Sequence, residues 1–286
     1  MIKPNTDLFE DLREGMDIIN IDKMTFQKSL SKYVKISNLS RKVSKLVAGR
    51  LVDYRKGWAS ILFTKICVIS ITLKKLVDHD TGKKYALHWD FSSAFSLVRN
   101  LMECYQTFYY LCIDNISDDE ALARKKLFNY HDFMARGKLF YKIGNEEVNA
   151  EIKERLISEL ESTNYFNQLD VKQKKHYLKG DTAFFLSREE IEERIGNSKN
   201  HFKINYQLLS SYTHSYPMGF YRMLEADRGT GVKTEVEEKY TAFSLSIAEV
   251  YLSLAIIDML ELFPDILDKI SKQEIQLLNI EYRGNL

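Results

Sequence analysis

Three long stretches of the chain are dominated by apolar residues, and their pattern predicts buried helices. They cover residues 58–77, 92–114 and 235–263. Each is longer than the roughly four to eight residues of a buried strand, so length favours helix even in the first, which is rich in β-branched residues. Charged residues lie inside the first and the third (Lys65, Lys74 and Lys75; Glu249, Asp258 and Glu261), which argues against membrane spans. We therefore expect a soluble protein built around three core helices.

Shorter amphipathic or polar segments flank these helices. The pattern predicts helices over 6–20, part of 23–56, 117–141, 146–162, 187–194, 198–214 and 264–280, with short helices and loops over 163–180. Residues that favour helix N-termini precede several of them, and Ser92 or Ser93 is the expected cap of the central apolar helix.

Composition agrees with an all-α fold. The chain has 286 residues, of which 45% are hydrophobic and 12% aromatic, with only three prolines and twelve glycines. Few residues that break helices and enough apolar surface for a large core favour helices over many tight turns. We predict an all-α, helical-bundle-like domain over 58–286, with residues 1–57 as amphipathic and basic helices packed on it.

Net charge and cysteine usage narrow the class further. The formal net charge is +1, so no global field directs the protein to nucleic acid or to a membrane. Cys67, Cys104 and Cys112 lie in apolar helical contexts without a CxxC or Cys/His spacing, which is typical of buried thiols in a reducing compartment. The polar N-terminus has no apolar core of a secretion signal. We expect a cytoplasmic protein that needs neither a metal nor a cofactor.

A basic section between residues 23 and 56 is the strongest local charge feature. Its cationic residues include Arg41, Lys42 and Lys45, interleaved with apolar residues at helical spacing. One interpretation is a surface that contacts phosphate or nucleic acid. The other, which we favour, is a solvated helix face whose charge is balanced by acidic residues elsewhere. Neither a GxxxxGK[ST] nor a GxGxxG motif accompanies it, so no nucleotide-binding loop is indicated.

The central apolar helix carries one conspicuous charge pair, Arg99 and Glu103. Residues four apart lie on one face of a helix. In so apolar a segment we expect the pair to be buried, which requires good hydrogen bonding.

A second polar group follows about a hundred residues later, in the segment YQLLSSYTHS. Tyr206, Ser210 and His214 lie four apart on one helical face, with Ser211 and Ser215 next to them. These side chains supply a phenol, hydroxyls and an imidazole that can satisfy the arginine and the carboxylate. His214 could act as a general acid or base, with Arg99 stabilising an anion and Glu103 orienting the ring. The alternative is a closed hydrogen-bond network that only locks the helices together.

The pattern R-x-x-x-E (Arg99, Glu103) followed by Y-x-x-x-S-x-x-x-H-S (Tyr206, Ser210, His214, Ser215) resembles a family of bacterial helical proteins known only as a domain of unknown function. The similarity would cover roughly residues 60–260. It implies an all-α fold and singles out the arginine, glutamate and histidine positions, without an established activity.

More distantly, the chain is similar to the HEPN class of helical nucleotide- and RNA-binding proteins, which includes ribonucleases of defence and toxin systems. Their mark is an arginine followed a few positions later by a histidine. Two stretches fit by length, Arg124 to His131 and Arg194 to His201. The alternative is that the first is an exposed pair on a helix and the second a helix end with a solvent-facing imidazole.

These observations leave three functions open. The leading hypothesis is a bacterial accessory or defence-type protein that binds RNA or a nucleotide, with metal-independent phosphodiester cleavage by His214 and Arg99. The second is a non-catalytic interaction module that forms a homo-oligomer or binds a protein partner. The third is a small-molecule pocket in which Arg99 binds a carboxylate or phosphate.

Overall fold

The computed structural model describes residues 25–78, 88–144, 149–214, 216–223 and 229–278. Within these ranges the chain forms helices and no strands, which confirms the predicted all-α class. Their contacts divide the chain into two compact units: unit 1 comprises residues 1–112 and 192–286, and unit 2 comprises residues 113–191. The predicted helix over 6–20 lies outside the described residues, and the predicted domain boundary after residue 57 stays a prediction.

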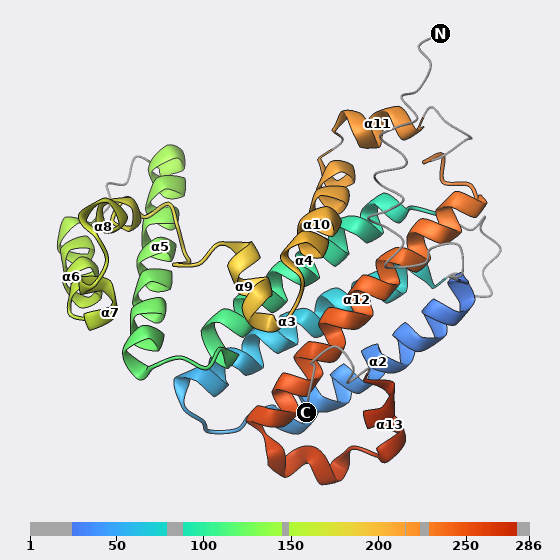
Figure 1. Cartoon of the computed structure of the whole chain (residues 1–286), viewed down its shortest axis with the longest axis horizontal. Helices are drawn as coiled ribbons and strands as arrows, with labels where there is room; N and C mark the ends of the chain where they lie inside the picture. Colours follow the sequence, from blue (N-terminus) through green and yellow to red (C-terminus); the bar gives the residue numbers. More distant parts are fainter. Residues whose placement is uncertain (1–24, 79–87, 145–148, 215, 224–228, 279–286) are drawn as a thin grey trace. The chain divides into compact units, whose positions relative to one another are not determined.

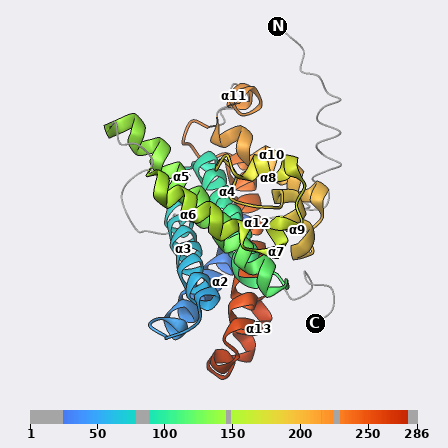
Figure 2. The ribbon, with the colours of Figure 1, turned by 90° about the vertical axis from the view of Figure 1, so that its left-hand side faces the viewer.

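Unit 1 is a bundle around one long apolar helix, α12 (Glu235–Leu262). It packs against α2 (Phe26–Val47), α3 (Tyr54–Val77) and α4 (Phe91–Phe108), as the two ribbon views show (Figures 1 and 2). Helix α10 (Lys199–Thr213) packs against α4, and α11 (Pro217–Met223) follows it. All three apolar stretches predicted to form the core are therefore core helices.

Helix α12 is, within the described ranges, the one helix long and apolar enough to cross a membrane. However, 83% of its apolar segment is buried inside the protein. That burial is what a core helix of a soluble protein requires, and it accounts for the hydropathy of the segment.

Buried polar contacts fix the helices of unit 1 against one another. The Tyr33 hydroxyl of α2 donates to Ser70 of α3 at 2.9 Å, and the Tyr105 hydroxyl of α4 donates to Asp258 of α12 at 2.8 Å. Burial raises the pKa of Tyr33 above its ordinary value. These bonds satisfy polar atoms that would otherwise be costly to bury.

Two helix boundaries differ from the sequence prediction. Helix α4 is capped by Asp90, whose side chain accepts from the Ser93 backbone N–H, so neither Ser92 nor Ser93 is the cap. The helix predicted over 264–280 is instead a 3₁₀ turn, η3 (Pro264–Lys269), and a separate helix, α13 (Lys272–Leu277). The extended conformation of Ile270 breaks the helix, and Ser271 starts a new one with a capping box.

The three cysteines are free and buried, as predicted. Cys104 lies on α4 and Cys112 on η2 (Tyr109–Ile113), a π-helical turn that continues it. Burial raises the pKa of Cys67 and of Cys104 to about 11 and that of Cys112 to about 12. Such thiols stay protonated and unreactive near neutral pH.

Unit 2 is a smaller helical cluster. It consists of α5 (Asp118–Gly144), α6 (Ala150–Glu161), α7 (Asn164–Asn167) and α8 (Val171–Tyr177), and α9 (Arg188–Ile195) leads from it to unit 1 in sequence. The last two helices of unit 2 are the short ones predicted over 163–180. Its core gathers Leu127, Leu160, Phe166 and Tyr177.

Candidate functional site

Helices α4 and α10 bring together four of the residues singled out in the sequence. Arg99 Nε donates to Glu103 Oε1 at 3.1 Å, and Arg99 Nη2 donates to the Tyr206 hydroxyl at 2.8 Å. The Tyr206 hydroxyl in turn donates to Glu103 Oε1 at 2.8 Å. His214 completes the group with Nε2 at 2.7 Å from Arg99 Nη1. We call Arg99, Glu103, Tyr206 and His214 the Arg99 cluster.

The contact between Arg99 and His214 defines the state of the imidazole. A guanidinium stays charged and can only donate hydrogen bonds, so Nε2 of the ring must accept. In this arrangement His214 is therefore neutral and carries its hydrogen on Nδ1. His214 is the residue that follows the last turn of α10, and its side chain is exposed to solvent.

The expected burial of the charge pair is wrong. The Arg99 side chain is 20% exposed and that of Glu103 is 31% exposed. Both lie at the edge of the contact between α4 and α10, because the apolar residues of α4 occupy its other faces. The guanidinium also stacks on the Tyr206 ring, with Cζ 4.8 Å from the ring centre. The cluster is thus organised by the protein but open to water on one side.

The serines predicted to belong to the site do not complete it. Ser210 and Ser211 donate to the backbone carbonyls of Tyr206 and Gln207 within α10, at 2.6 and 2.8 Å. In these bonds the two hydroxyls donate to the backbone of their own helix and not to a residue of the Arg99 cluster. Ser215 lies outside the described residues. A contact that the sequence did not suggest, between Ser96 and Thr213 hydroxyls at 3.1 Å, joins the two helices instead.

The structure does not bring Arg194 or His201 into the Arg99 cluster. His201 is exposed in the first turn of α10, thirteen residues before His214, which corresponds to about 20 Å along a helix. Arg194 is also exposed, and its backbone carbonyl accepts from the Tyr109 hydroxyl at 2.7 Å.

Arg124 is not the exposed residue of our alternative interpretation. Its side chain is 1% exposed and pairs with Asp114 at 2.8 Å and with Glu120. Its partner by spacing, His131, is half-buried. The sequence did not indicate this burial, because the segment around Arg124 is rich in charged residues. One of the two carboxylate partners, Asp114, also lies outside α5, in the segment before it.

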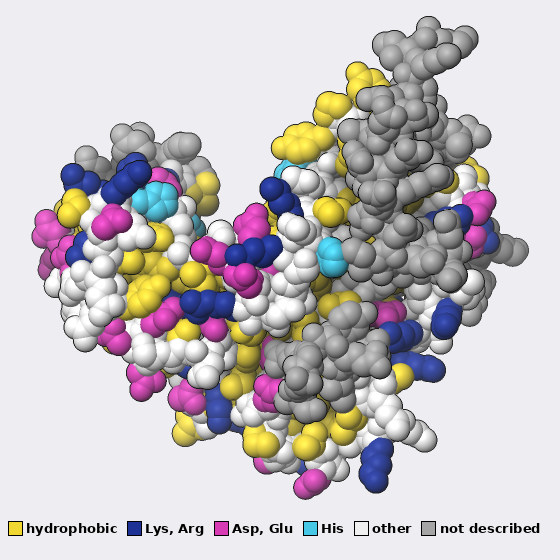
Figure 3. Space-filling view, viewed as in Figure 1, with side chains coloured by type: hydrophobic (Ala, Val, Ile, Leu, Met, Phe, Trp, Pro, Cys, Tyr) yellow, Lys and Arg dark blue, Asp and Glu magenta, His cyan; other side chains and the backbone are white. Residues whose placement is uncertain are grey.

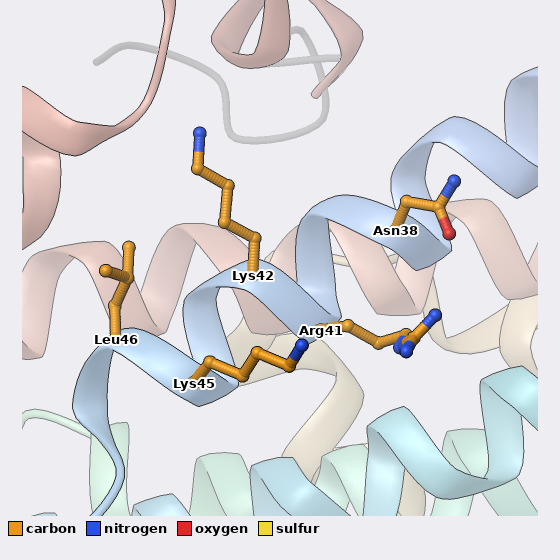
Figure 4. Close-up of a pocket in the computed structure, with 5 residues that line it drawn as sticks. All are labelled: Asn38, Arg41, Lys42, Lys45 and Leu46. Atoms are coloured by element: carbon orange, nitrogen blue, oxygen red, sulfur yellow. The ribbon is translucent and has the colours of Figure 1, made fainter.

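Most of the basic section forms α2, and acidic residues from the C-terminal elements pair with the section. Lys32 pairs with Glu249, Lys42 with Glu274 and Arg50 with Asp265, at 2.9, 2.8 and 2.8 Å. A shallow hollow of about 480 Å³ is lined by Asn38, Arg41, Lys42, Lys45 and Leu46 (Figure 4). In this view Lys42 points away from Arg41 and Lys45. The pairs favour the solvated, charge-balanced interpretation of this section.

Exposed aromatic rings next to His214 are a feature that the sequence analysis missed. Tyr216, Phe220 and Tyr221 are 55%, 53% and 60% exposed. The ring of Tyr216 lies 5.4 Å from that of His214. In the space-filling view, hydrophobic side chains gather over α11 with histidine and basic atoms beside them (Figure 3). The segment SYPMGFY could have indicated these rings in the sequence, because it is rich in aromatic residues and directly follows a polar helix end.

Over the described part of the chain, no three His, Cys, Asp or Glu side chains lie close enough together to hold a metal ion.

Comparison with known proteins gives a family but no relative of known function. No curated protein and no solved structure matches the chain. A family model does match, described as a family of unknown function (DUF5677), over residues 56–231. The match includes every residue of the Arg99 cluster and leaves the basic helix α2 outside it, as the resemblance seen in the sequence implied. Because it covers more than half of the chain, the protein belongs to this family of unknown function, DUF5677.

Proposed function

We propose that the Arg99 cluster binds a phosphate group of RNA or of a nucleotide in the bacterial cytoplasm. The observation that carries the proposal is a guanidinium that is partly exposed (20%) and held in place by three neighbours, with an exposed imidazole at its side. Arginine is suited to phosphate because its planar fork of donors matches two phosphate oxygens. Glu103 and Tyr206 hold that fork in position before a ligand arrives.

The exposed rings of Tyr216, Phe220 and Tyr221 support RNA as the source of that phosphate. Bases of single strands stack on exposed aromatic side chains, and this is worth about 1–3 kcal/mol per base. Phosphate binding and base stacking within a few residues of each other are the two components of single-strand recognition.

The cluster also supports metal-independent cleavage of RNA, of the kind carried out by HEPN-like ribonucleases in defence or toxin systems. A phosphate that accepts from Arg99 Nη1 takes this hydrogen bond from His214 Nε2, and the nitrogen can then act as a base. His214 would remove the proton of the 2′-hydroxyl, whose oxygen attacks phosphorus. The bond to the 5′-oxygen breaks, this oxygen takes a proton from water, and a cyclic phosphate remains. Arg99 stabilises the charge that develops on the phosphate.

The second candidate function is a non-catalytic interaction module, as a homo-oligomer or an accessory subunit. The observation that favours it is that each arginine nitrogen of the cluster already has a partner within the protein. On this view the four side chains only join α4 to α10. The exposure of His214 favours the binding function, because a ligand can reach the ring from the solvent.

The test is binding and cleavage of a labelled single-stranded RNA by the full chain, with a chelator present. We expect His214→Ala and Arg99→Gln to abolish cleavage, and Arg99→Gln to weaken binding about tenfold or more, as for loss of a charge-assisted hydrogen bond. His201→Ala is the matched control, since it removes an exposed imidazole from the other end of α10. Binding without cleavage would reject the catalytic step alone. RNA that is neither bound nor cut would support the interaction module.

A further inference from the structure

The outer face of α3 exposes large apolar side chains to solvent. Ile61 is 68% exposed and Val68 is 57% exposed, and Tyr54, seven residues before Ile61, is 38% exposed. Because seven residues are close to two helical turns, the three side chains form one row along the helix, about 21 Å long. We call Tyr54, Ile61 and Val68 the α3 row. It belongs to none of the sites considered so far.

The α3 row is distinct from the faces by which the helix joins the bundle. Helix α3 packs against α2, α4 and α12, and its core side chains, such as Phe63, Ile66 and Leu73, are fully buried. Isolated apolar residues are common on protein surfaces and need no partner. A row with heptad spacing is different, because it is the pattern by which one helix packs along another.

The two helices that form this surface are basic and contain no acidic residue. Helix α2 has six Lys or Arg and α3 has five, and neither has an Asp or a Glu. On α3, Lys65 lies between Ile61 and Val68, and Lys75 continues the α3 row by one more heptad; both are exposed. Within the ranges that the structure describes, neither lysine forms an ion pair.

Helix α2 adds basic residues along one side of the α3 row. Ser44 Oγ of α2 lies 3.4 Å from Thr64 Oγ1 of α3, so the two helices meet at the surface beside the row. Arg41 and Lys45, on either side of Ser44 in sequence, are exposed and point to the same side of α2 (Figure 4). In the described part of the chain they also form no ion pair. Cations from two helices therefore border an apolar row.

This combination favours a partner that is both acidic and apolar, since the charges of two surfaces that bind each other are complementary. Twofold pairing of α3 with α3 of a second copy is disfavoured, because Lys65 lies near the middle of the α3 row and would face its own copy. Nucleic acid is disfavoured because unpaired bases stack on aromatic rings, whereas the two most exposed members of the row, Ile61 and Val68, are aliphatic.

We propose that the outer face of α3 is a docking surface for an acidic amphipathic helix of a partner protein. The apolar side of that helix packs along the α3 row, at the shallow crossing angle typical of coiled coils. Its Asp and Glu residues pair with Lys65 and Lys75 on α3 and with the basic residues of α2. The proposal goes beyond the function of the Arg99 cluster and does not depend on it, because the docking surface includes no residue of that cluster.

The test is binding of a labelled helical peptide to the full chain, followed by fluorescence anisotropy. The probe has about three heptads, with Leu at the a and d positions and Glu at the positions that flank them. The control probe carries Lys in place of each Glu. We expect the acidic probe to bind in the micromolar range and the control probe to bind about tenfold more weakly or worse. About 0.5 M salt should weaken the acidic probe, since exposed charges contribute to its binding.

Three variants test the residues. Ile61→Glu should weaken the acidic probe about tenfold or more, because it places a carboxylate inside the α3 row, and circular dichroism checks that the variant is folded. Leu139→Glu is the matched control, since Leu139 is a 56% exposed aliphatic residue of α5, and it should bind the probe as the parent chain does. Lys65→Glu should weaken the acidic probe and strengthen the control probe, a reversal that partial unfolding would not produce.

Four outcomes would overturn the proposal. They are no binding of the acidic probe at millimolar concentration, and equal binding of the two probes. A third is self-association of the parent chain in sedimentation that Ile61→Glu abolishes, which would make a second copy the occupant. The fourth is single-stranded RNA that binds the parent chain and is weakened by Ile61→Glu, which would make RNA the occupant.

Discussion

Two arginines of this protein, Arg99 in unit 1 and Arg124 in unit 2, form the same local pair with a glutamate four residues away on a helix. Arg124 is 1% exposed and has two carboxylate partners, Asp114 and Glu120. Arg99 is 20% exposed, and its partners are one carboxylate, a phenol and a neutral imidazole. The comparison teaches that spacing alone does not separate a structural ion pair from the site that we propose at Arg99. What separates them is access to water and partners that an incoming anion can replace.

The largest effect is expected from Arg124→Met. Removing the guanidinium leaves Asp114 and Glu120 as nearly buried carboxylates without their cation, which typically costs about 3–5 kcal/mol. The free energy of unfolding, measured by urea titration followed by circular dichroism, should fall accordingly. Arg136→Met is the matched control on the same helix, because its pair with Asp132 is 63% and 57% exposed and should be worth less than about 1 kcal/mol. Equal losses in the two variants would contradict the structural role of Arg124.

Glu192 is a buried carboxylate that accepts hydrogen bonds from amides and a phenol, and the pH dependence of its contribution to stability extends the comparison. Glu192 is fully buried and accepts from Gln106 Nε2 at 2.7 Å and from Asn197 Nδ2 at 2.6 Å. Desolvation by burial raises its pKa, and hydrogen bonds from Asn197, Gln106 and Tyr251 offset this only in part. The folded state therefore binds this proton more tightly than the unfolded state, and the stability it provides is lost as the pH rises through the raised value.

Glu192→Gln tests that direction. The amide cannot ionise, so the stability of the parent chain relative to the variant should decrease from about pH 4, near the ordinary glutamate pKa, towards neutral pH. Unfolding of both proteins across this range measures the difference. A difference that grows in favour of the parent chain as the pH rises would reverse the sign and show that the hydrogen bonds outweigh desolvation.

Arg99→Gln should have a small effect on folding in spite of its large expected effect on binding. Since the pair with Glu103 is open to water, its loss should lower the free energy of unfolding by about 1 kcal/mol or less. The measurement is the same urea titration as for Arg124→Met. A loss as large as that of Arg124→Met would mean that the Arg99 cluster is structural, and it would favour the interaction module.

Sequence reasoning predicted the Arg99 cluster because its members repeat every four residues on two helices, so that each helix presents them on one face. It could not predict their exposure, which depends on where α10 ends over α4. The burial of Arg124 was also not predicted. The local sequence does not distinguish a charged residue on an exposed helix face from one that neighbouring segments cover. A cavity of about 260 Å³ in unit 1 could not be predicted either, because segments around residues 88–92, 212–220 and 229–237 form it only after folding.

The smallest effect is expected at the pair between Lys42 and Glu274, which belongs to the basic section. The Lys42 ammonium, with the Ser271 backbone N–H, lowers the pKa of Glu274 to about 2. The pair is exposed enough for solvent to screen it, with 40% of the lysine and 27% of the glutamate side chain accessible. Glu274→Gln should therefore cost less than about 1 kcal/mol, and about 1 M salt should remove most of that difference.

The same variant tests whether the basic helix α2 competes with the Arg99 cluster for RNA. Removing an acidic partner makes the surface around Arg41, Lys42 and Lys45 more cationic. If this surface contacts phosphate, Glu274→Gln should bind RNA more tightly, and the salt dependence of binding should become steeper. We expect neither change, because acidic residues of the C-terminal elements pair with Lys32 and Lys42 of this helix and with Arg50 just after it. The Arg99 cluster instead faces water with an imidazole beside its guanidinium. If Glu274→Gln binds RNA more tightly and Arg99→Gln binds RNA as the parent chain does, the RNA site lies on α2 and not at the Arg99 cluster.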